Sequence, residues 1–284
     1  MTEWLLLLEL FWRPALTGAL LAILLPLFGL ILRLRHEYWA ALAYGQLGAA
    51  GALGALALGC PPLLGGLVAS LAAAGAKHPL EKRLLSTGLF PLLFILGWSA
   101  SQLLTANLPG VERPGAALFE GQLYFASAEM LVGAALALVA GGIFLWSKNG
   151  DLLLAHLYPA HFHAQERPTW AVRIGFDLLV ATALALAVMS LGVMGAFALI
   201  FIPPWLVCVF SPSWRIALIA APVLSFLAYM FAFTLALHHD QPFGSMLALV
   251  LCVTALCLPV AAVVRRKNSV PSSAVTGERS QEKE

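Results

Sequence analysis

The chain of 284 residues is 61% hydrophobic and 11% charged, with a mean hydropathy of +0.90. Soluble domains carry about 25% charged residues, so this composition excludes an ordinary soluble protein. The formal net charge of +2 is spread over loop ends and forms no basic patch, so nothing indicates a nucleic-acid partner.

The N-terminal residues 1–13 do not resemble a secretory signal peptide, because they carry Glu3 and Glu9 but no basic residue before Arg13. Their leucines and aromatic residues, Trp4 among them, favour a short helix that lies in the outer membrane interface as an anchor. We therefore expect an interfacial segment ahead of the first membrane span.

About nine apolar segments of membrane-spanning length follow in chain order. They cover residues 14–32, 38–58, 62–76, 84–104, 127–146, 174–191, 195–210, 214–237 and 246–264. The fold class is therefore all-α, a polytopic helical membrane protein with about nine transmembrane helices. Its transmembrane domain is predicted over residues 14–265. The polar tail at residues 266–284 is predicted to be disordered in the cytosol.

The basic residues fix the expected orientation. If the first span begins outside, 14 of the 16 basic residues fall on one side of the membrane. The inside set is Arg33, Arg35, Lys77, Lys82, Arg83, Lys148, Arg167, Arg173, Arg215, Arg265, Arg266, Lys267, Arg279 and Lys283, and the outside set is Arg13 and Arg113. Cytoplasmic loops carry an excess of Lys and Arg, so we expect the N-terminus outside and the C-terminus in the cytosol.

Small residues and prolines distinguish three of the spans. The second and third are rich in Gly and Ala, which lets membrane helices pack closely, so both are expected inside the bundle. The seventh contains Pro203 and Pro204, which remove backbone donors and predict a broken helix. Such a break marks either a transport pathway or a tolerated kink, and the sequence leaves both open.

The longest connection on the inner side covers residues 147–172. Asp151 is placed to cap a short apolar helix that contains Leu153, Leu154 and His156 and ends at Pro159. Such a helix is what a cytosolic partner would press against. An ordinary interfacial helix is the alternative.

Four segments together resemble the permease family of bacterial metal-uptake ABC transporters, the zinc, manganese and iron type. They are Pro26-Leu27-Phe28-Gly29-Leu30-Ile31-Leu32-Arg33-Leu34-Arg35, Ala41-Leu42-Ala43-Tyr44-Gly45-Gln46-Leu47-Gly48, Gly192 to Pro204, and Asp240-Gln241-Pro242-Phe243-Gly244. They keep the family's order and spacing over most of residues 14–264. The resemblance implies an ABC permease fold in a bacterial inner membrane. It also implies a permease homodimer, a cytosolic ATPase that binds the ATP, an external metal-binding protein, and a coupling helix in the loop that starts at Asp151.

The chain departs from the family at the residues that line its metal path. In the family, the second helix carries an Asp and, four residues later, a His, and the matching positions here are Ala40 and Tyr44. An aspartate and a histidine at that spacing share one helix face and bind divalent cations, whereas alanine and a neutral phenol do not. The chain therefore moves metal without that pair, uses other ligands, or moves another species. Pathway candidates are Tyr44, Gln46, Pro203 and Pro204.

The remaining metal-ligand candidates lie in two loops. His238, His239 and Asp240 precede the last span on the outer side, where imidazole and carboxylate groups could receive an ion such as zinc. Solvated loop residues are the alternative. His161 and His163, with His156, form a second cluster on the inner loop, where the alternatives are a cytosolic metal sensor and a plain partner contact.

Two further ionisable residues lie near predicted span ends. Glu129 precedes the fifth span and Asp177 begins the sixth, and ionisable groups at membrane depth are functional candidates. Asp177 is expected to pair with Arg173, four residues earlier on the same helix.

These observations favour the membrane subunit of an ABC importer for a divalent metal, zinc first, with manganese, iron or a metal chelate as alternatives. No GxxxxGK[ST] motif is present, so ATP hydrolysis is expected on a separate chain, and no cofactor and no enzymatic activity are expected of this one. A self-sufficient secondary transporter is the second hypothesis. It would need a central coupling-ion site, and the sequence shows no central acidic residue and no clear repeat.

Overall fold

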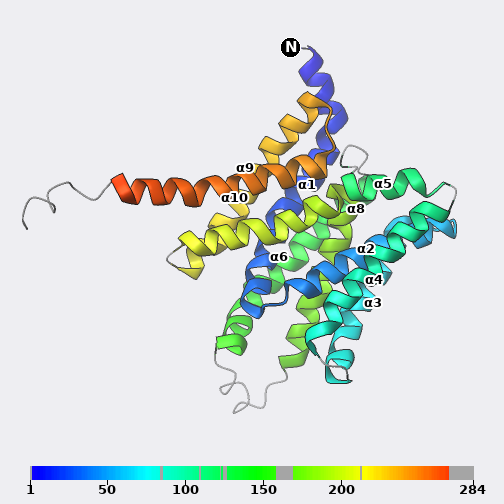
Figure 1. Ribbon diagram of the computed structural model, residues 1–284, viewed down its shortest axis with the longest axis horizontal. Helices are drawn as coiled ribbons and strands as arrows, with labels where there is room; N and C mark the ends of the chain where they lie inside the picture. The colour runs from blue at the N-terminus through cyan, green and yellow to red at the C-terminus, as the bar shows by residue number, and fades with distance from the viewer. Residues whose placement is uncertain are drawn as a thin grey trace, which may run out of the picture.

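The structure is a computed structural model that describes residues 2–83, 86–108, 110–121, 123, 127–157, 169–211 and 213–268. Within these residues it contains nine helices and no strand (Figure 1). They are α1 (Thr2–Arg35), α2 (Tyr38–Ala57), α3 (Pro62–Arg83), α4 (Ser86–Asn107), α5 (Glu112–Glu120), α6 (Ala128–Leu157), α8 (Thr169–Phe210), α9 (Trp214–His239) and α10 (Phe243–Asn268). The predicted all-helical fold is confirmed.

The helices have the lengths that a membrane requires. In the described part of the chain, six are long and apolar enough to cross a bilayer, and α3 and α10 contribute shorter apolar stretches. One of the six is α8, whose apolar stretch Val172–Phe210 has 39 residues, about the length of two crossings. The predicted spans at 174–191 and 195–210 are the two halves of this helix, which changes direction at Gly192.

The helices form two neighbouring groups (Figure 1). α2, α3 and α4 pack side by side, while α1 packs against α6, α8 and α9. Close backbone approach joins α2 to α3, because a Cβ added at Gly51 would lie 2.5 Å from the carbonyl oxygen of Gly65. The small residues of these two spans therefore allow close helix packing. α3 nevertheless exposes Leu64 and Val68, so the expectation that both helices lie inside the bundle is wrong for α3.

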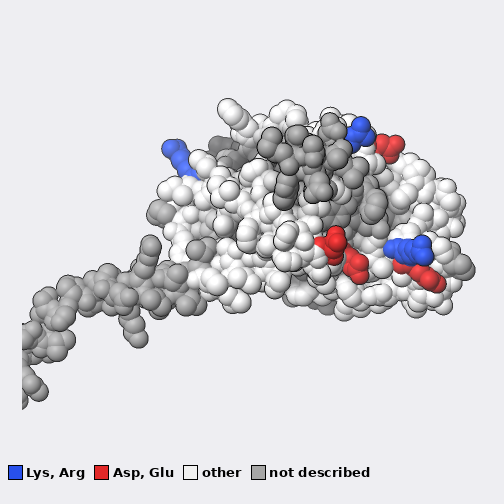
Figure 2. Space-filling model, turned by 90° about the horizontal axis from the view of Figure 1, so that it is seen from above, with Lys and Arg blue, Asp and Glu red and all other residues white. Residues whose placement is uncertain are grey.

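The outer surface of the bundle is apolar, as a lipid-facing surface must be. Large apolar side chains are exposed along α4 and α6, including Leu96, Leu103, Leu136 and Val139. In Figure 2 only a few charged side chains lie among the uncharged residues of one face. In water such continuous apolar exposure would promote aggregation, so this surface fits a bilayer environment.

Three glycines join three helices at the point where α8 changes direction. Gly192 has φ 80° and ψ 163°, a conformation available essentially to glycine alone. A Cβ there would lie 2.6 Å from the backbone nitrogen of Gly121, which follows α5. A Cβ at Gly244, in the first turn of α10, would lie 2.5 Å from the carbonyl oxygen of Leu191. The three backbones thus meet without room for side chains.

Two helices run further than expected. α1 begins at Thr2 and continues through Pro14, so the N-terminal segment is continuous with the first span, and its place in the membrane interface stays a prediction. α6 continues from the predicted span to Leu157, so Asp151 lies in the interior of a long helix and does not cap a short one. A single proline, or a short polar stretch such as the one near Asp151, does not end a helix when the residues on both sides favour it.

The structure also contains one helix that was not predicted. α5 lies in the connection between the fourth and fifth predicted spans. Its signals are local, with Glu112 and Pro114 in the first turn and Gly121, at φ 87°, directly after the last turn. An acidic first turn and a terminal glycine are typical helix boundaries, so this helix could have been found from the sequence.

The expected orientation has a direct test. Reporter fusions after Asn107 and after Lys267 should fall on opposite sides of the membrane, because an odd number of crossings separates these points. Alkaline phosphatase should be active after Asn107, and green fluorescent protein should fluoresce after Lys267. The same reporter active at both points would contradict the orientation.

Candidate functional site

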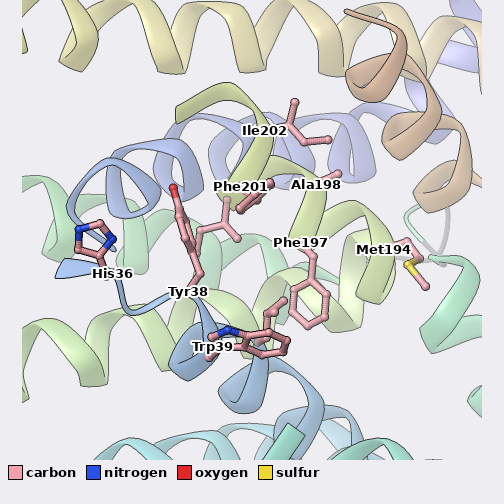
Figure 3. A pocket seen from close by; sticks show the side chains of 10 residues that line it. His36, Tyr38, Trp39, Met194, Phe197, Ala198, Phe201 and Ile202 are labelled. Carbon is pink, nitrogen blue, oxygen red and sulfur yellow. The ribbon is translucent and has the colours of Figure 1, made fainter. Parts of the chain in front are cut away.

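A cavity of about 570 Å³ lies between the start of α2 and the second half of α8 (Figure 3). Its volume is within the usual range for small-molecule sites. Its lining residues are His36, Tyr38, Trp39, Leu42, Met194, Phe197, Ala198, Ile200, Phe201 and Ile202. The walls are thus aromatic and aliphatic, with His36 and the Tyr38 hydroxyl as the main polar groups.

Aromatic contacts shape this cavity. The rings of Tyr38 and Phe201 meet edge to face, with centroids 4.9 Å apart. The Tyr38 hydroxyl donates a hydrogen bond to the carbonyl oxygen of Gly29 in α1, at 3.2 Å. Figure 3 shows Trp39 and Phe197 among the side chains that line the cavity from its two facing elements. The two walls meet directly at the Tyr38–Phe201 pair.

The α1–α2 corner positions one wall of the cavity. His36 has φ 55°, a left-handed conformation that ends α1, and the backbone N–H of Glu37 donates to the carbonyl oxygen of Leu32 at 3.0 Å. On the other side, Nη1 of Arg33 donates to the carbonyl oxygen of Trp205 at 2.9 Å, which holds the corner against α8. The tight corner turns α2 back so that its first residues face α8.

The proline pair does not break α8, which agrees with the alternative of a tolerated proline pair and not with that of a broken helix. Pro203 and Pro204 are both buried inside the helix, which continues to Phe210. Pro204 cannot donate to the carbonyl oxygen of Ile200, four residues earlier. That carbonyl faces Gly29 of α1, where an added Cβ would lie 2.0 Å from it. Close packing against a glycine therefore accommodates the freed carbonyl.

The second-helix pathway candidates lie beside the cavity and do not line it. Ala40, Tyr44 and Gln46 are all buried within the bundle. The ring of Tyr44 meets Phe90 of α4 edge to face, with centroids 6.5 Å apart. The Gln46 side-chain amide has no hydrogen-bond partner among the residues that the structure describes. The α2 residues that do line the cavity include Trp39, which sequence reasoning missed because it is an ordinary apolar residue in an apolar span.

A closed ring of four ion pairs lies next to the corner between α1 and α2. Its members are Arg35 at the end of α1, Glu37 before α2, Lys77 of α3 and Asp177 of α8. Glu37 Oε2 lies 2.7 Å from Arg35 Nη2 and 2.9 Å from Lys77 Nζ. Asp177 lies 3.4 Å from Arg35 Nη1 through Oδ1 and 3.0 Å from Lys77 Nζ through Oδ2. We call these four residues the ionic ring.

Burial distinguishes the ionic ring from an ordinary surface salt bridge. The side chains of Lys77 and Asp177 are 4% and 5% exposed, and that of Glu37 is 25% exposed. The expected pairing of Asp177 with Arg173 is therefore wrong, because Arg173 lies on the exposed face of α8 while Asp177 faces the bundle. A rule for neighbours within one helix cannot identify partners that lie on two other helices, α1 and α3.

The predicted outer metal ligands lie at the end of α9. His238 and His239 are exposed in its last turn, with ring centroids 4.9 Å apart, and Asp240 follows in a left-handed conformation with φ 50°. Among the described residues, no group of three or more His, Cys, Asp or Glu side chains is arranged to hold a metal ion. An ion at these three residues would therefore require their side chains to rearrange.

The predicted coupling residues lie in the last turns of α6. Asp151, Leu153, Leu154 and His156 all belong to this helix, and Leu153 is partly buried. His161 and His163 lie outside the described residues. Glu129 is exposed in the first turn of α6, at the opposite end of the helix.

The overall architecture matches known transporter structures. No protein-family model and no curated protein matches the chain. One similar structure is PsaBC from Streptococcus pneumoniae in complex with Fab, with a TM-score of 0.77 and 14% identity over 90% of this chain and 94% of that one. Another is described as an inward-facing conformation of a proposed metal-chelate type ABC transporter, with a TM-score of 0.71 and 16% identity over 90% of this chain and 85% of that one. The chain thus has the fold of these transporters.

Proposed function

We propose that this chain is the membrane permease subunit of a bacterial ABC importer for a divalent metal ion, zinc first. The observation that carries the proposal is the shared fold, which extends over 90% of the chain at a TM-score of 0.77. ATP would be hydrolysed by a separate cytosolic subunit, and an external binding protein would deliver the substrate. The permease would convert movement of the ATPase into alternating access of a central path.

The cavity between α2 and α8 is the best candidate for part of that path. It opens on exposed apolar side chains, with Trp39 53%, Met194 47% and Phe201 45% exposed. A second copy of the chain would cover these residues, so we propose a permease homodimer with the path between its subunits. Trp39 and its neighbours would then face the transported species.

The lining of the cavity favours a metal chelate as the second candidate substrate. A bare divalent cation is very costly to hold among apolar groups without anionic ligands. The aromatic walls formed by Tyr38, Trp39 and Phe201 suit an organic ligand that surrounds the metal. Uptake of Zn²⁺ alone and of Zn²⁺ with an organic chelator, compared in one vesicle preparation, distinguishes the two substrates.

The end of α6 is the proposed contact for the ATPase. The double variant L153D/L154D should release the ATPase from the purified permease, because two carboxylates would face an apolar contact. The matched control L153M/L154M keeps the apolar character and should retain the ATPase. Co-purification measures the result, and an L153D/L154D permease that still retains the ATPase would contradict the proposed contact.

The outer residues His238, His239 and Asp240 are the proposed receiving site for the ion. Replacing all three with alanine should reduce Zn²⁺ uptake at limiting metal much more than at excess metal, because imidazole and carboxylate groups are zinc ligands and raise the local affinity for the ion. T234V is the control, because Thr234 is exposed on the same helix and its hydroxyl bonds only within that helix, to the carbonyl oxygens of Met230 and Phe231. Unchanged uptake at limiting metal would show that the three residues are solvated loop residues.

A further inference from the structure

The ionic ring shares the α1–α2 corner with one wall of the cavity. Arg35 and Glu37 belong to the ring, while His36, Tyr38 and Trp39 line the cavity, so ring and wall residues share one five-residue corner. Figure 3 shows His36, Tyr38 and Trp39 on this corner of the chain. Consecutive residues of a tight corner cannot move independently, so a shift of the ring moves this wall.

The second wall is connected to the ring through α8. Asp177 lies in the first half of this helix, and the residues from Met194 to Ile202 that line the cavity lie in the second half. The first half of α8 also follows the segment that the proposed function assigns to ATPase contact. Movement that enters at the inner end of α8 therefore reaches Asp177 before it reaches the cavity.

Two aromatic rings lie against the two cations of the ionic ring. The Arg35 guanidinium lies 5.2 Å from the ring centroid of Phe176, and the Lys77 ammonium lies 5.7 Å from that of Phe90. Phe90 also meets the ring of Tyr44. The ionic ring thus contacts α1, α2, α3, α4 and α8 within one small volume.

The arrangement of charges suits a contact that changes between two states. Each cation touches both anions, so the helices can shift while every charge keeps one partner. The partly exposed Glu37 gives water access to one edge of the ring. An apolar core of the same volume often stabilises a fold at least as well, so stability alone does not explain the buried Lys77 and Asp177 and their two partners.

We propose that the ionic ring couples movement of the inner end of α8 to the cavity walls, with Lys77 and Asp177 as positioning residues for transport. This inference rests on the proposed function. It requires that the nucleotide state of the ATPase change the exposure of the cavity, and that the change depend on the ring. Differences of this kind between coupled sites are typically about fivefold or more.

The experiment measures exposure of the cavity in the purified permease–ATPase complex. W39C, in a background without the four native cysteines, reports exposure through its rate of reaction with a fluorescent maleimide. The rate is measured without nucleotide and with ATP and vanadate. With the ring intact, we expect the two rates to differ about fivefold or more. With K77M/D177L added, we expect the ratio to fall to about one while ATP hydrolysis continues.

The control is T182V, which lies on α8 near the ring and removes a hydroxyl that bonds within its own helix to the carbonyl oxygen of Leu178 at 2.8 Å. It should keep the full ratio. An unchanged ratio in K77M/D177L would overturn the inference, and so would failure of that variant to accumulate, since the ring would then serve the fold alone. A complex with an intact ring that hydrolyses no ATP would instead refute the proposed function, and the inference would fall with it.

Discussion

Replacing Gly192 with alanine should lower the free energy of unfolding by about 2–6 kcal/mol. Two costs contribute. The backbone conformation at this residue, φ 80° and ψ 163°, costs a residue other than glycine about 1–3 kcal/mol, and overpacking costs about 1–3 kcal/mol. The new Cβ would lie 2.6 Å from the backbone nitrogen of Gly121, and backbone cannot rotate away as a flexible side chain can. Denaturation of the detergent-purified protein, followed by tryptophan fluorescence, measures the change.

The matched control is Gly142→Ala in the middle of α6. An added Cβ there meets nothing within 4 Å, and the residue is helical, so alanine should be neutral or stabilise the helix by about 0.5–1 kcal/mol. If both variants unfold at the same denaturant concentration as the original chain, the meeting of α5, α8 and α10 at Gly192 is not as close as the structure shows.

Removing one charge from the ionic ring should destabilise the protein more than removing two. K77M leaves Asp177 and Glu37 to share Arg35, and an uncompensated buried charge costs about 3–5 kcal/mol. K77M/D177L removes a cation and an anion together and keeps the Arg35–Glu37 pair at 2.7 Å. Replacing a buried ion pair with apolar groups is often neutral or stabilising, so the double variant should regain most of the lost stability.

The comparison of single and double variants also checks the geometry. Unfolding midpoints of K77M, D177L and K77M/D177L should give a non-additive cycle, because the two side chains touch at 3.0 Å. Additive effects would show that Lys77 and Asp177 do not interact, which would contradict the ionic ring.

The general architecture could be predicted because its signals are local. Apolar segment lengths predict helices that span a membrane, and glycines such as Gly51 predict close helix packing, without knowledge of any partner. The change of direction in α8 also had a local signal, since Gly192 lies in the short connection expected between two spans. The non-helical backbone at Gly192 confirms a break between two helical segments at that connection.

The ionic ring could not be predicted because its members lie far apart in the chain. Arg35, Lys77 and Asp177 meet only when α1, α3 and α8 pack together. The distribution of basic residues between the two sides of the membrane places Arg35 and Lys77 in loops on the inner side. The four-residue spacing on one helix predicts that Asp177 pairs with Arg173. For the same reason Trp39 was missed, since an aromatic residue becomes part of a cavity only through the element that faces it.

ATP-dependent uptake by the reconstituted complex tests the central claim most directly. The tagged chain, purified in mild detergent with the subunits that accompany it, is placed in vesicles with ATP on the side of the ATPase and Zn²⁺, alone or chelated, on the other. We predict that a separate chain with a GxxxxGK[ST] motif co-purifies with the permease and that uptake requires ATP hydrolysis. Uptake by this chain alone, independent of ATP and driven by an ion gradient, would contradict this prediction.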